Sequence, residues 1–243
     1  MRSVREGSVA GVVLAGGSGT RMTARSNKAF IPLAGRRLVS WSLNSLARLP
    51  EVGPLVLVVR DEDRALAEEV LDREVPARAI DLVIGGTTRH RSEMAALEHL
   101  RPDISSGRVS LVLTHDAARP LVTLTLIRSV VATAVEFGAS VPALLDDDIV
   151  EIDEKGRLAA GSRRRRLVRA QTPQVFDAAE LLAAFDAAQV DGFDGPDTSS
   201  CVERYSDMSV HWVEGDPRNL KVTYPQDLFV AERLLAAANF EIV

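Results

Sequence analysis

Short apolar runs rich in β-branched residues alternate with amphipathic stretches along about the first 146 residues of this chain. This alternation restricts the fold more than any other feature of the sequence. Each apolar run is short enough to be a strand, and the runs are residues 8–15, 54–59, 80–84, 108–115 and 139–144. Apolar residues recur at helical spacing in the stretches between them, at 37–49, 62–72, 91–100 and 125–137. The pattern predicts an α/β fold with a doubly wound, mostly parallel sheet covered by helices on both faces.

After about residue 146 the pattern changes. Residues 146–170 are polar and contain a turn between two short extended pieces, so we expect a hairpin or arm that projects from the sheet. A helix at 177–188, a strand at 208–215 and a last helix from about Pro225 to Ala238 are expected to follow, with proline in its favoured place at a helix start. Because no internal repeat or dividing linker is visible, we expect residues 1–243 to form a single domain.

Charge and composition exclude several functional classes. The net charge of −5 argues against a general nucleic-acid binder, which needs a basic face. The single cysteine, Cys201, can form neither an internal disulfide nor a multi-cysteine zinc site. No apolar run approaches the roughly 20 residues that cross a bilayer, and glycines rather than a cleavage site follow the first run. We therefore expect a cytoplasmic protein that binds neither nucleic acid nor membranes.

The stretch LAGGSGTRMTARSNKAF, residues 14–30, directly follows the first predicted strand. Sheets of this kind bind ligands outside the carboxyl ends of their strands. Glycines there let backbone N–H groups approach an anion, although a plain tight turn would also use them. The spacing matches neither the Walker motif nor G-x-G-x-x-G. Arg21 and Lys28 favour a phosphate ligand, because two cations could stabilise the charge of a transferring phosphoryl group; the alternative for Lys28 is a solvated loop lysine.

Several motifs in fixed order carry a family resemblance. They are LAGGSGTRM with NKAF, GGTTRHRS (85–92), HDAARP (115–120), QTPQVF (171–176), PDTSS (196–200) and EGDPRNLKVTYPQDL (214–228). Through them the chain, from about Gly11 to Leu234, resembles the sugar-nucleotidyltransferase fold and, within it, the cytidylyltransferases acting on polyol phosphates. These comprise 2-C-methyl-D-erythritol 4-phosphate cytidylyltransferase and ribitol 5-phosphate cytidylyltransferase. The resemblance implies transfer of CMP from CTP to a polyol phosphate, with release of pyrophosphate.

The nucleotide side of the site follows from this resemblance. It implies that CTP is bound by Ala15, Gly16, Gly17, Ser18, Gly19, Gly86, Thr87, Ser92 and Asp116. It also matches Arg21 and Lys28 to the catalytic pair that neutralises the attacked α-phosphate. From the residues alone, GGTTRHRS is equally compatible with a glycine turn and a helix cap at Thr87 or Thr88.

Asp116 follows the fourth predicted strand. A carboxylate near a triphosphate needs a cation or a hydroxyl donor beside it, so we expect Asp116 to accept ribose hydroxyls or to face a hydrated Mg²⁺. A local ion pair with Arg119 is the alternative. Mg²⁺ is the cofactor that the chemistry implies, because it bridges phosphate oxygens and retains waters. No carboxylate cluster in the sequence indicates a dedicated protein site for it.

On the acceptor side, the resemblance implies that the polyol phosphate is bound by Arg164, Lys221, Asp148, Thr172, Asp197 and Arg119. It further implies a homodimer in which the arm crosses a two-fold axis and brings Arg164 to the partner's site. Without the resemblance, the run RRRR at 163–166 is typical of a solvated charge run or a nucleic-acid patch, and NLKVT of a plain strand with an exposed lysine.

The arm departs from the family pattern. Asp148 stands where members that use methylerythritol phosphate often carry threonine, and Val150 stands where some have lysine. We take 2-C-methyl-D-erythritol 4-phosphate as the first choice of acceptor and ribitol 5-phosphate as the alternative, toward which LAGG leans slightly. A non-catalytic nucleotide sensor is an alternative of another class, but it would have no use for acceptor-side cations such as Arg164 and Lys221.

Overall fold

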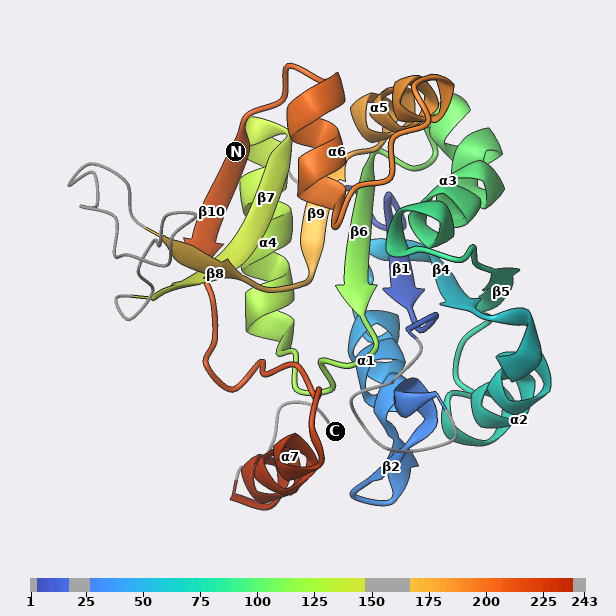
Figure 1. The fold of residues 1–243 in the computed structure, drawn as a ribbon, viewed down its shortest axis with the longest axis vertical. Coiled ribbons are helices and arrows are strands. Elements are labelled where there is room, and N and C mark those ends of the chain that lie inside the picture. The colour runs from blue at the N-terminus through green and yellow to red at the C-terminus, as the bar shows by residue number, and fades with distance from the viewer. Residues whose placement is uncertain (1–3, 18–26, 147–166, 238–243) are drawn as a thin grey trace, which may run out of the picture.

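A computed structural model describes residues 4–17, 27–146 and 167–237 of the chain (Figure 1). Most of the predicted arm, with Asp148 and Arg164, lies outside the described residues, as do Ser18, Gly19 and Arg21. Within the described part, strands build one large sheet in the order β10-β7-β9-β6-β1-β4-β5, and β8 pairs with β7. The strands are β1 (Val9–Leu14), β4 (Val52–Val59), β5 (Asp81–Ile84), β6 (Leu111–Asp116), β7 (Ala139–Leu145), β8 (Val168–Ala170), β9 (Gln174–Asp177) and β10 (Val210–Glu214).

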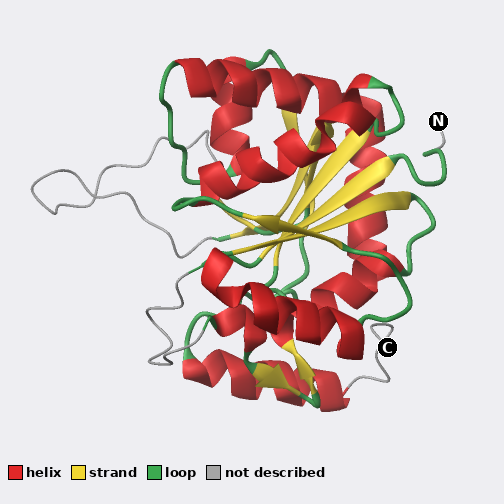
Figure 2. Ribbon diagram, turned by 90° about the vertical axis from the view of Figure 1, so that its right-hand side faces the viewer, coloured by secondary structure: helices red, strands yellow, loops and turns green. Residues whose placement is uncertain are grey.

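Helices cover both faces of this sheet, as Figure 2 shows. The core against one face includes side chains from α1 (Leu38–Ala47), α2 (Arg64–Glu74) and α4 (Leu124–Phe137). The core against the other face includes side chains from α3 (Arg89–Ser105), α5 (Ala178–Val190) and α6 (Thr198–Tyr205). The predicted doubly wound α/β architecture is therefore confirmed.

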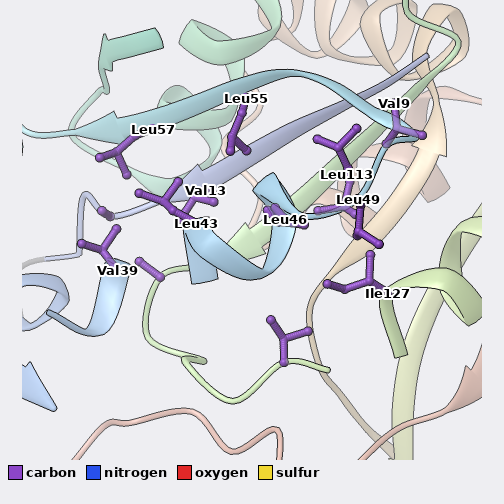
Figure 3. Close-up of a cluster of buried hydrophobic side chains, with 14 of the residues drawn as sticks. Val9, Val13, Val39, Leu43, Leu46, Leu49, Leu55, Leu57, Leu113 and Ile127 are labelled. Atoms are coloured by element: carbon purple, nitrogen blue, oxygen red, sulfur yellow. The ribbon is translucent and has the colours of Figure 1, made fainter. Parts of the chain in front are cut away.

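Strand β1 explains why the two cores form. Successive side chains of a strand point to opposite faces. Val9 and Val13 belong to the core on the α1 side (Figure 3), whereas Ala10 and Val12 belong to the core on the α3 side. Because each of these residues is almost fully buried, the strand reads as a continuous apolar run.

The sheet is mixed in one place that the sequence did not reveal. Strand β1 pairs in parallel with both β4 and β6, and β10 pairs in parallel with β7. Strand β9 lies between β6 and β7 and is antiparallel to both. A four-residue strand is too short to show a period, which is why QTPQVF is a motif but not a visible strand in the sequence.

A smaller apolar cluster lies beside the main sheet. It joins the hairpin of β2 (Pro32–Leu33) and β3 (Arg36–Arg37) to the last helix, α7 (Pro225–Ala237). Its buried members are Leu33, Leu38, Trp41, Leu121, Val222 and Ala231. Because Val222 is buried here, the segment that precedes α7 is fixed next to the end of β6. None of the helices in the described part of the chain combines the length and apolarity needed to cross a membrane.

Candidate active site

A cavity of about 650 Å³ opens at the carboxyl end of β1. Strand β1 lies between β4 and β6, so the connections from β1 and its neighbours diverge here (Figure 1), which is where open α/β sheets bind ligands. Most of the predicted site residues that are described line it, namely Ala15, Gly16, Gly17, Lys28, Gly86, Thr87, Ser92, Asp116 and Lys221. The structure therefore brings together residues from both ends of the chain.

The cavity glycines fall into two groups. A Cβ atom at Gly17 would meet no heavy atom within 4 Å, and one at Gly16 would lie 3.5 Å from Ser92 Oγ, an ordinary contact. Neither residue has a positive φ. A Cβ at Gly86, in contrast, would lie 2.3 Å from Cβ of Arg91. Gly86 is therefore required by packing, whereas the space at Gly16 and Gly17 is open for a ligand to approach the backbone.

Lys28 is held beside the glycine loop by its neighbour. The side-chain amide of Asn27 donates to the Ala15 carbonyl and, at 2.8 Å, to Asp63 Oδ2. Its amide oxygen accepts from the backbone N–H of Ala29 at 3.0 Å and so caps the short helix η2 (Lys28–Phe30). Lys28 Nζ donates to the Val222 carbonyl at 3.3 Å. Lys28 is thus a cavity residue anchored on two sides rather than a freely solvated loop lysine.

The wall formed by the start of α3 places one hydroxyl in the cavity. Thr88 is the N-cap of α3: its Oγ1 accepts from the Arg91 backbone N–H at 3.2 Å, which confirms the predicted helix cap. Ser92 lies on the first turn, lines the cavity and donates to the Thr88 carbonyl at 2.9 Å. Because its proton is used in that bond, the lone pairs of Ser92 Oγ remain able to accept from a ligand.

Asp116 lies at the end of β6 between two cations. Arg89 Nη1 donates to Asp116 Oδ1, and Lys221 Nζ lies 2.7 Å from Asp116 Oδ2. Burial alone would raise the pKa of Asp116, but Arg89 and Lys221 hold it well below its usual range, so the carboxylate stays ionised. The alternative of a local ion pair between Asp116 and Arg119 is wrong, because these other two cations take both carboxylate oxygens.

Arg119 has a different task. Its guanidinium is buried and donates to the carbonyls of Asn219, at 2.7 Å, and Ala170, at 3.4 Å. The predicted ligand Arg119 therefore ties the end of β8 and the segment before Lys221 to the loop after β6. Arg119 is not among the residues that line the cavity.

Thr172 supports Asp116 from behind. Its Oγ1 accepts from the Asp116 backbone N–H at 3.0 Å and lies 3.1 Å from His115 Nδ1. His115 Nε2 is 3.1 Å from the Arg119 carbonyl, which can only accept, so Nε2 carries the proton and Nδ1 accepts from Thr172. Burial lowers the pKa of His115 to about 4, which keeps this ring neutral. Thr172, predicted as an acceptor ligand, is thus placed one step outside the cavity lining.

Asp197 is also away from the cavity lining. Its carboxylate caps α6 by accepting from the Ser200 backbone N–H at 2.9 Å and from the Ser200 hydroxyl at 2.6 Å. The motif PDTSS therefore begins a helix whose first residue, Thr198, contacts Glu93 of α3 at 2.8 Å. The contribution of Asp197 in the described structure is to position that helix.

Sequence reasoning missed three buried residues around Asp116, namely Arg89, Glu93 and His115. Glu93 accepts from Arg89 Nε at 2.8 Å, and burial raises the pKa of Glu93 to about 7 even though Arg89 and Thr198 act to lower it. An Arg-x-x-x-Glu spacing on one helix is a usable signal. The predicted helix began at residue 91, however, so Arg89 lay outside it.

Within the described residues, no group of three or more His, Cys, Asp or Glu side chains could hold a metal ion. Asp116 is the cavity carboxylate nearest the two phosphate-binding lysines in the network above, and it already has two cationic partners. A single carboxylate fits a Mg²⁺ that arrives with a triphosphate and keeps its waters, but not a metal bound by the protein alone.

Comparisons with known proteins agree with this geometry. Residues 9–237 match the model of the IspD family, described as 2-C-methyl-D-erythritol 4-phosphate cytidylyltransferase. The enzyme of that name from Solibacter usitatus is 38% identical over 93% of this chain and 95% of its own length. The one from Geobacillus kaustophilus is 35% identical over 95% and 98%.

A solved structure gives the same result. The 4-diphosphocytidyl-2C-methyl-D-erythritol synthase of Anaerococcus prevotii superposes with a TM-score of 0.81 at 27% identity, covering 94% of this chain and 96% of the other. Fold, motif order and the match along almost the whole chain point the same way. The chain belongs to the 2-C-methyl-D-erythritol 4-phosphate cytidylyltransferase family.

Proposed function

We propose that this chain transfers CMP from CTP to 2-C-methyl-D-erythritol 4-phosphate and releases pyrophosphate, a step in the synthesis of isoprenoid precursors. One observation carries the proposal: two lysines from distant segments reach one open, glycine-lined cavity. Lys28 Nζ bonds the carbonyl of Val222, the residue that follows Lys221, and both lysines line the cavity. Two cations beside one cavity suit two substrates that each carry phosphate. Membership of the family supports this pair of substrates.

In the proposed reaction, an oxygen of the acceptor's phosphate forms a bond to the α-phosphorus of CTP. The bond from that phosphorus to the oxygen bridging the β-phosphate breaks, and pyrophosphate leaves with the electron pair. Lys28 and the backbone N–H groups of Gly16 and Gly17 stabilise the developing charge, and Lys221 binds the acceptor's phosphate. Arg21, outside the described residues, is the proposed second cation on the α-phosphate. No covalent intermediate on the protein is needed, because positioning and charge stabilisation carry the rate.

Selection of cytosine is assigned to the wall at the start of α3. Ser92 Oγ has lone pairs available for an exocyclic amino group, and the backbone at Gly86 lies beside it, 3.4 Å from Ser92 Oγ to the Gly86 carbonyl. The close packing of Gly86 on Arg91 leaves this wall little room to move. A fixed, small pocket accepts a pyrimidine edge and excludes a purine by size.

Mg²⁺ is proposed to enter with the triphosphate, with Asp116 as the residue facing it. When bound, the ion would bridge phosphate oxygens and neutralise part of their charge. The contribution of the chain is to keep Asp116 ionised, which the two adjacent cations already do.

A homodimer through the arm is also proposed. At the base of the arm, the apolar side chains of Leu145, Leu167 and Val168 are 47%, 37% and 43% exposed, so a partner would cover them. If Arg164 acts in the neighbour's site, mixing an Arg164→Ala chain with a Lys28→Ala chain will restore activity, because one site of the mixed dimer then has both residues. Dead mixtures after verified subunit exchange, together with a monomeric sedimentation profile, would refute the dimer.

The activity is tested by pyrophosphate release with CTP, UTP or ATP and a panel of polyol phosphates. We expect the highest turnover with CTP and 2-C-methyl-D-erythritol 4-phosphate. Faster turnover with ribitol 5-phosphate would replace the acceptor by the alternative. Tight CTP binding without pyrophosphate release from any acceptor would instead indicate a nucleotide sensor.

A further inference from the structure

One guanidinium links Asp116 to a second carboxylate that the proposed mechanism does not use. Glu93 lies one helical turn after Arg89 on α3, is 1% exposed, and is not among the cavity-lining residues. Arg89 donates from Nε to Glu93 Oε1 at 2.8 Å and from Nη1 to Asp116 Oδ1. Arg89 therefore bridges a carboxylate that faces the ligand and one that is buried outside the cavity.

Glu93 is itself oriented by the opposite side of the core. Thr198, at the start of α6, donates to Glu93 Oε1 at 2.8 Å, and the oxygen of Thr198 lies 3.3 Å from Oγ1 of Thr114 on β6. Glu93 Oε2 has no hydrogen-bond partner among the described residues. A buried carboxylate with an unbonded oxygen is a poor stabilising element, and an apolar residue of similar volume would serve the core as well. What Glu93 supplies that an apolar residue could not is the orientation of Arg89.

That orientation is needed because Lys221 has two partners in the reaction. In the structure Lys221 Nζ is 2.7 Å from Asp116 Oδ2, whereas the proposed function requires the same ammonium on the acceptor's phosphate. When Lys221 moves to the phosphate, Asp116 loses one of its two cations. Arg89, which also lines the cavity, is then the remaining partner of Asp116 and is at the same time attracted by the triphosphate.

We propose that Glu93 is a positioning residue, which holds Arg89 on Asp116 so that Asp116 stays fixed when Lys221 turns to the acceptor. The inference rests on the proposed function. Without the negative charge of Glu93, Arg89 is free to move from Asp116 toward the phosphates of CTP. The acceptor side of the reaction then suffers, while the binding of CTP does not.

Glu93→Gln tests this, because glutamine keeps the shape and an acceptor oxygen but removes the charge. We expect kcat with CTP and 2-C-methyl-D-erythritol 4-phosphate to fall about tenfold, as misplaced groups typically cause. The KM of the acceptor should rise, and the Kd of CTP, measured by calorimetry without acceptor, should stay unchanged or decrease. The melting temperature near pH 8 should not fall. Glu98→Gln is the matched control, since Glu98 lies on the same helix and pairs with Arg101 on the surface.

A double-mutant cycle identifies the route. If Glu93 acts through Arg89, then Glu93→Gln added to Arg89→Lys will cost little more than Arg89→Lys alone. Additive losses would overturn the proposal, as would wild-type turnover in Glu93→Gln, or a parallel loss of melting temperature and CTP affinity. Absence of turnover in the wild-type chain with every polyol phosphate would overturn the proposed function instead, so the two failures are distinguishable.

Discussion

The two walls of the cavity are built on different principles. The nucleotide wall consists of small residues and backbone groups, such as Gly16, Gly17 and Gly86, which lie in short contiguous motifs. The acceptor wall is charged: Asp116 is held by Arg89 from α3 and by Lys221 from the segment before α7. The first wall depends on space, and local sequence provides it. The second depends on buried charges, which are correct only when distant segments meet.

The largest expected effect comes from the cation between the two walls. Lys28→Ala should lower kcat by about 10²–10³, as loss of a preorganised charge-stabilising group does, and leave the melting temperature nearly unchanged. Its neighbour Asn27, rather than Lys28, makes the hydrogen bonds that fix the loop. Pyrophosphate-release kinetics beside calorimetric melting measure both. Near-normal turnover would remove Lys28 from the mechanism.

Loss of Lys221 should affect the acceptor wall alone. A charge-assisted hydrogen bond contributes about 1.5–3 kcal/mol, so Lys221→Ala should raise the KM of the acceptor by roughly 10- to 100-fold. The KM of CTP should change little, because Asp116 keeps Arg89 as a partner. Steady-state kinetics in both substrates decide this. A larger effect on CTP than on the acceptor would contradict the division into two walls.

Two glycine substitutions compare space kept for a ligand with space filled by the fold. Gly17→Ala should leave the melting temperature unchanged, since its Cβ meets nothing within 4 Å, but should weaken CTP binding several-fold if the phosphates approach this backbone. Gly86→Ala places a Cβ 2.3 Å from Arg91 and should lower both stability and CTP affinity. Normal CTP affinity in Gly17→Ala would show that the loop does not contact the nucleotide.

The smallest effect concerns stability against pH, and it arises from two buried groups with opposite signs. His115 has its pKa lowered to about 4, so the stability it contributes is present above its ordinary value of 6.5 and is lost as the pH falls toward 4. Glu93 has its pKa raised from 4.5 to about 7, by burial and despite Arg89, so its contribution is present below 4.5 and is lost as the pH rises through 7.

Glu93→Gln removes only the second contribution. Relative to the wild type, its free energy of unfolding should therefore increase from about pH 5 to about pH 8, by on the order of 2 kcal/mol. Urea titrations at several pH values measure this difference. The matched Glu98→Gln variant should show none, because Glu98 is on the surface. A flat difference for Glu93→Gln would mean that Glu93 does not titrate in this range.

Much of the fold could be predicted from the sequence, because periodicity records burial directly. The strand predicted at 139–144 is observed as β7 (Ala139–Leu145), and the helix predicted at 125–137 as α4 (Leu124–Phe137). Helix α6 was not predicted, because few of its eight residues are buried and its apolar period is weak. The antiparallel insertion of β9 was missed because hydrogen-bond partners are not written in a strand's own residues.

The site divides in the same way. The glycine loop, Lys28 and Ser92 were placed correctly at the cavity by local motifs and by the rule that ligands bind at the carboxyl ends of strands. The partner of Asp116 was predicted wrongly as Arg119, since neighbours in sequence seemed the simplest ion pair. Arg119 instead bonds backbone carbonyls.

By itself, then, the sequence determined the layered α/β architecture, the position of the glycine loop and the residue types available for phosphate chemistry. These follow from local patterns of apolar residues, glycines and charges, each confined to one segment. Only the tertiary structure decided which charges are paired, which hydroxyls support Asp116, and that Arg89 is shared between Asp116 and Glu93. The physical reason is that a buried charge is stable only beside its partner, and partners from distant segments meet only after the chain has packed.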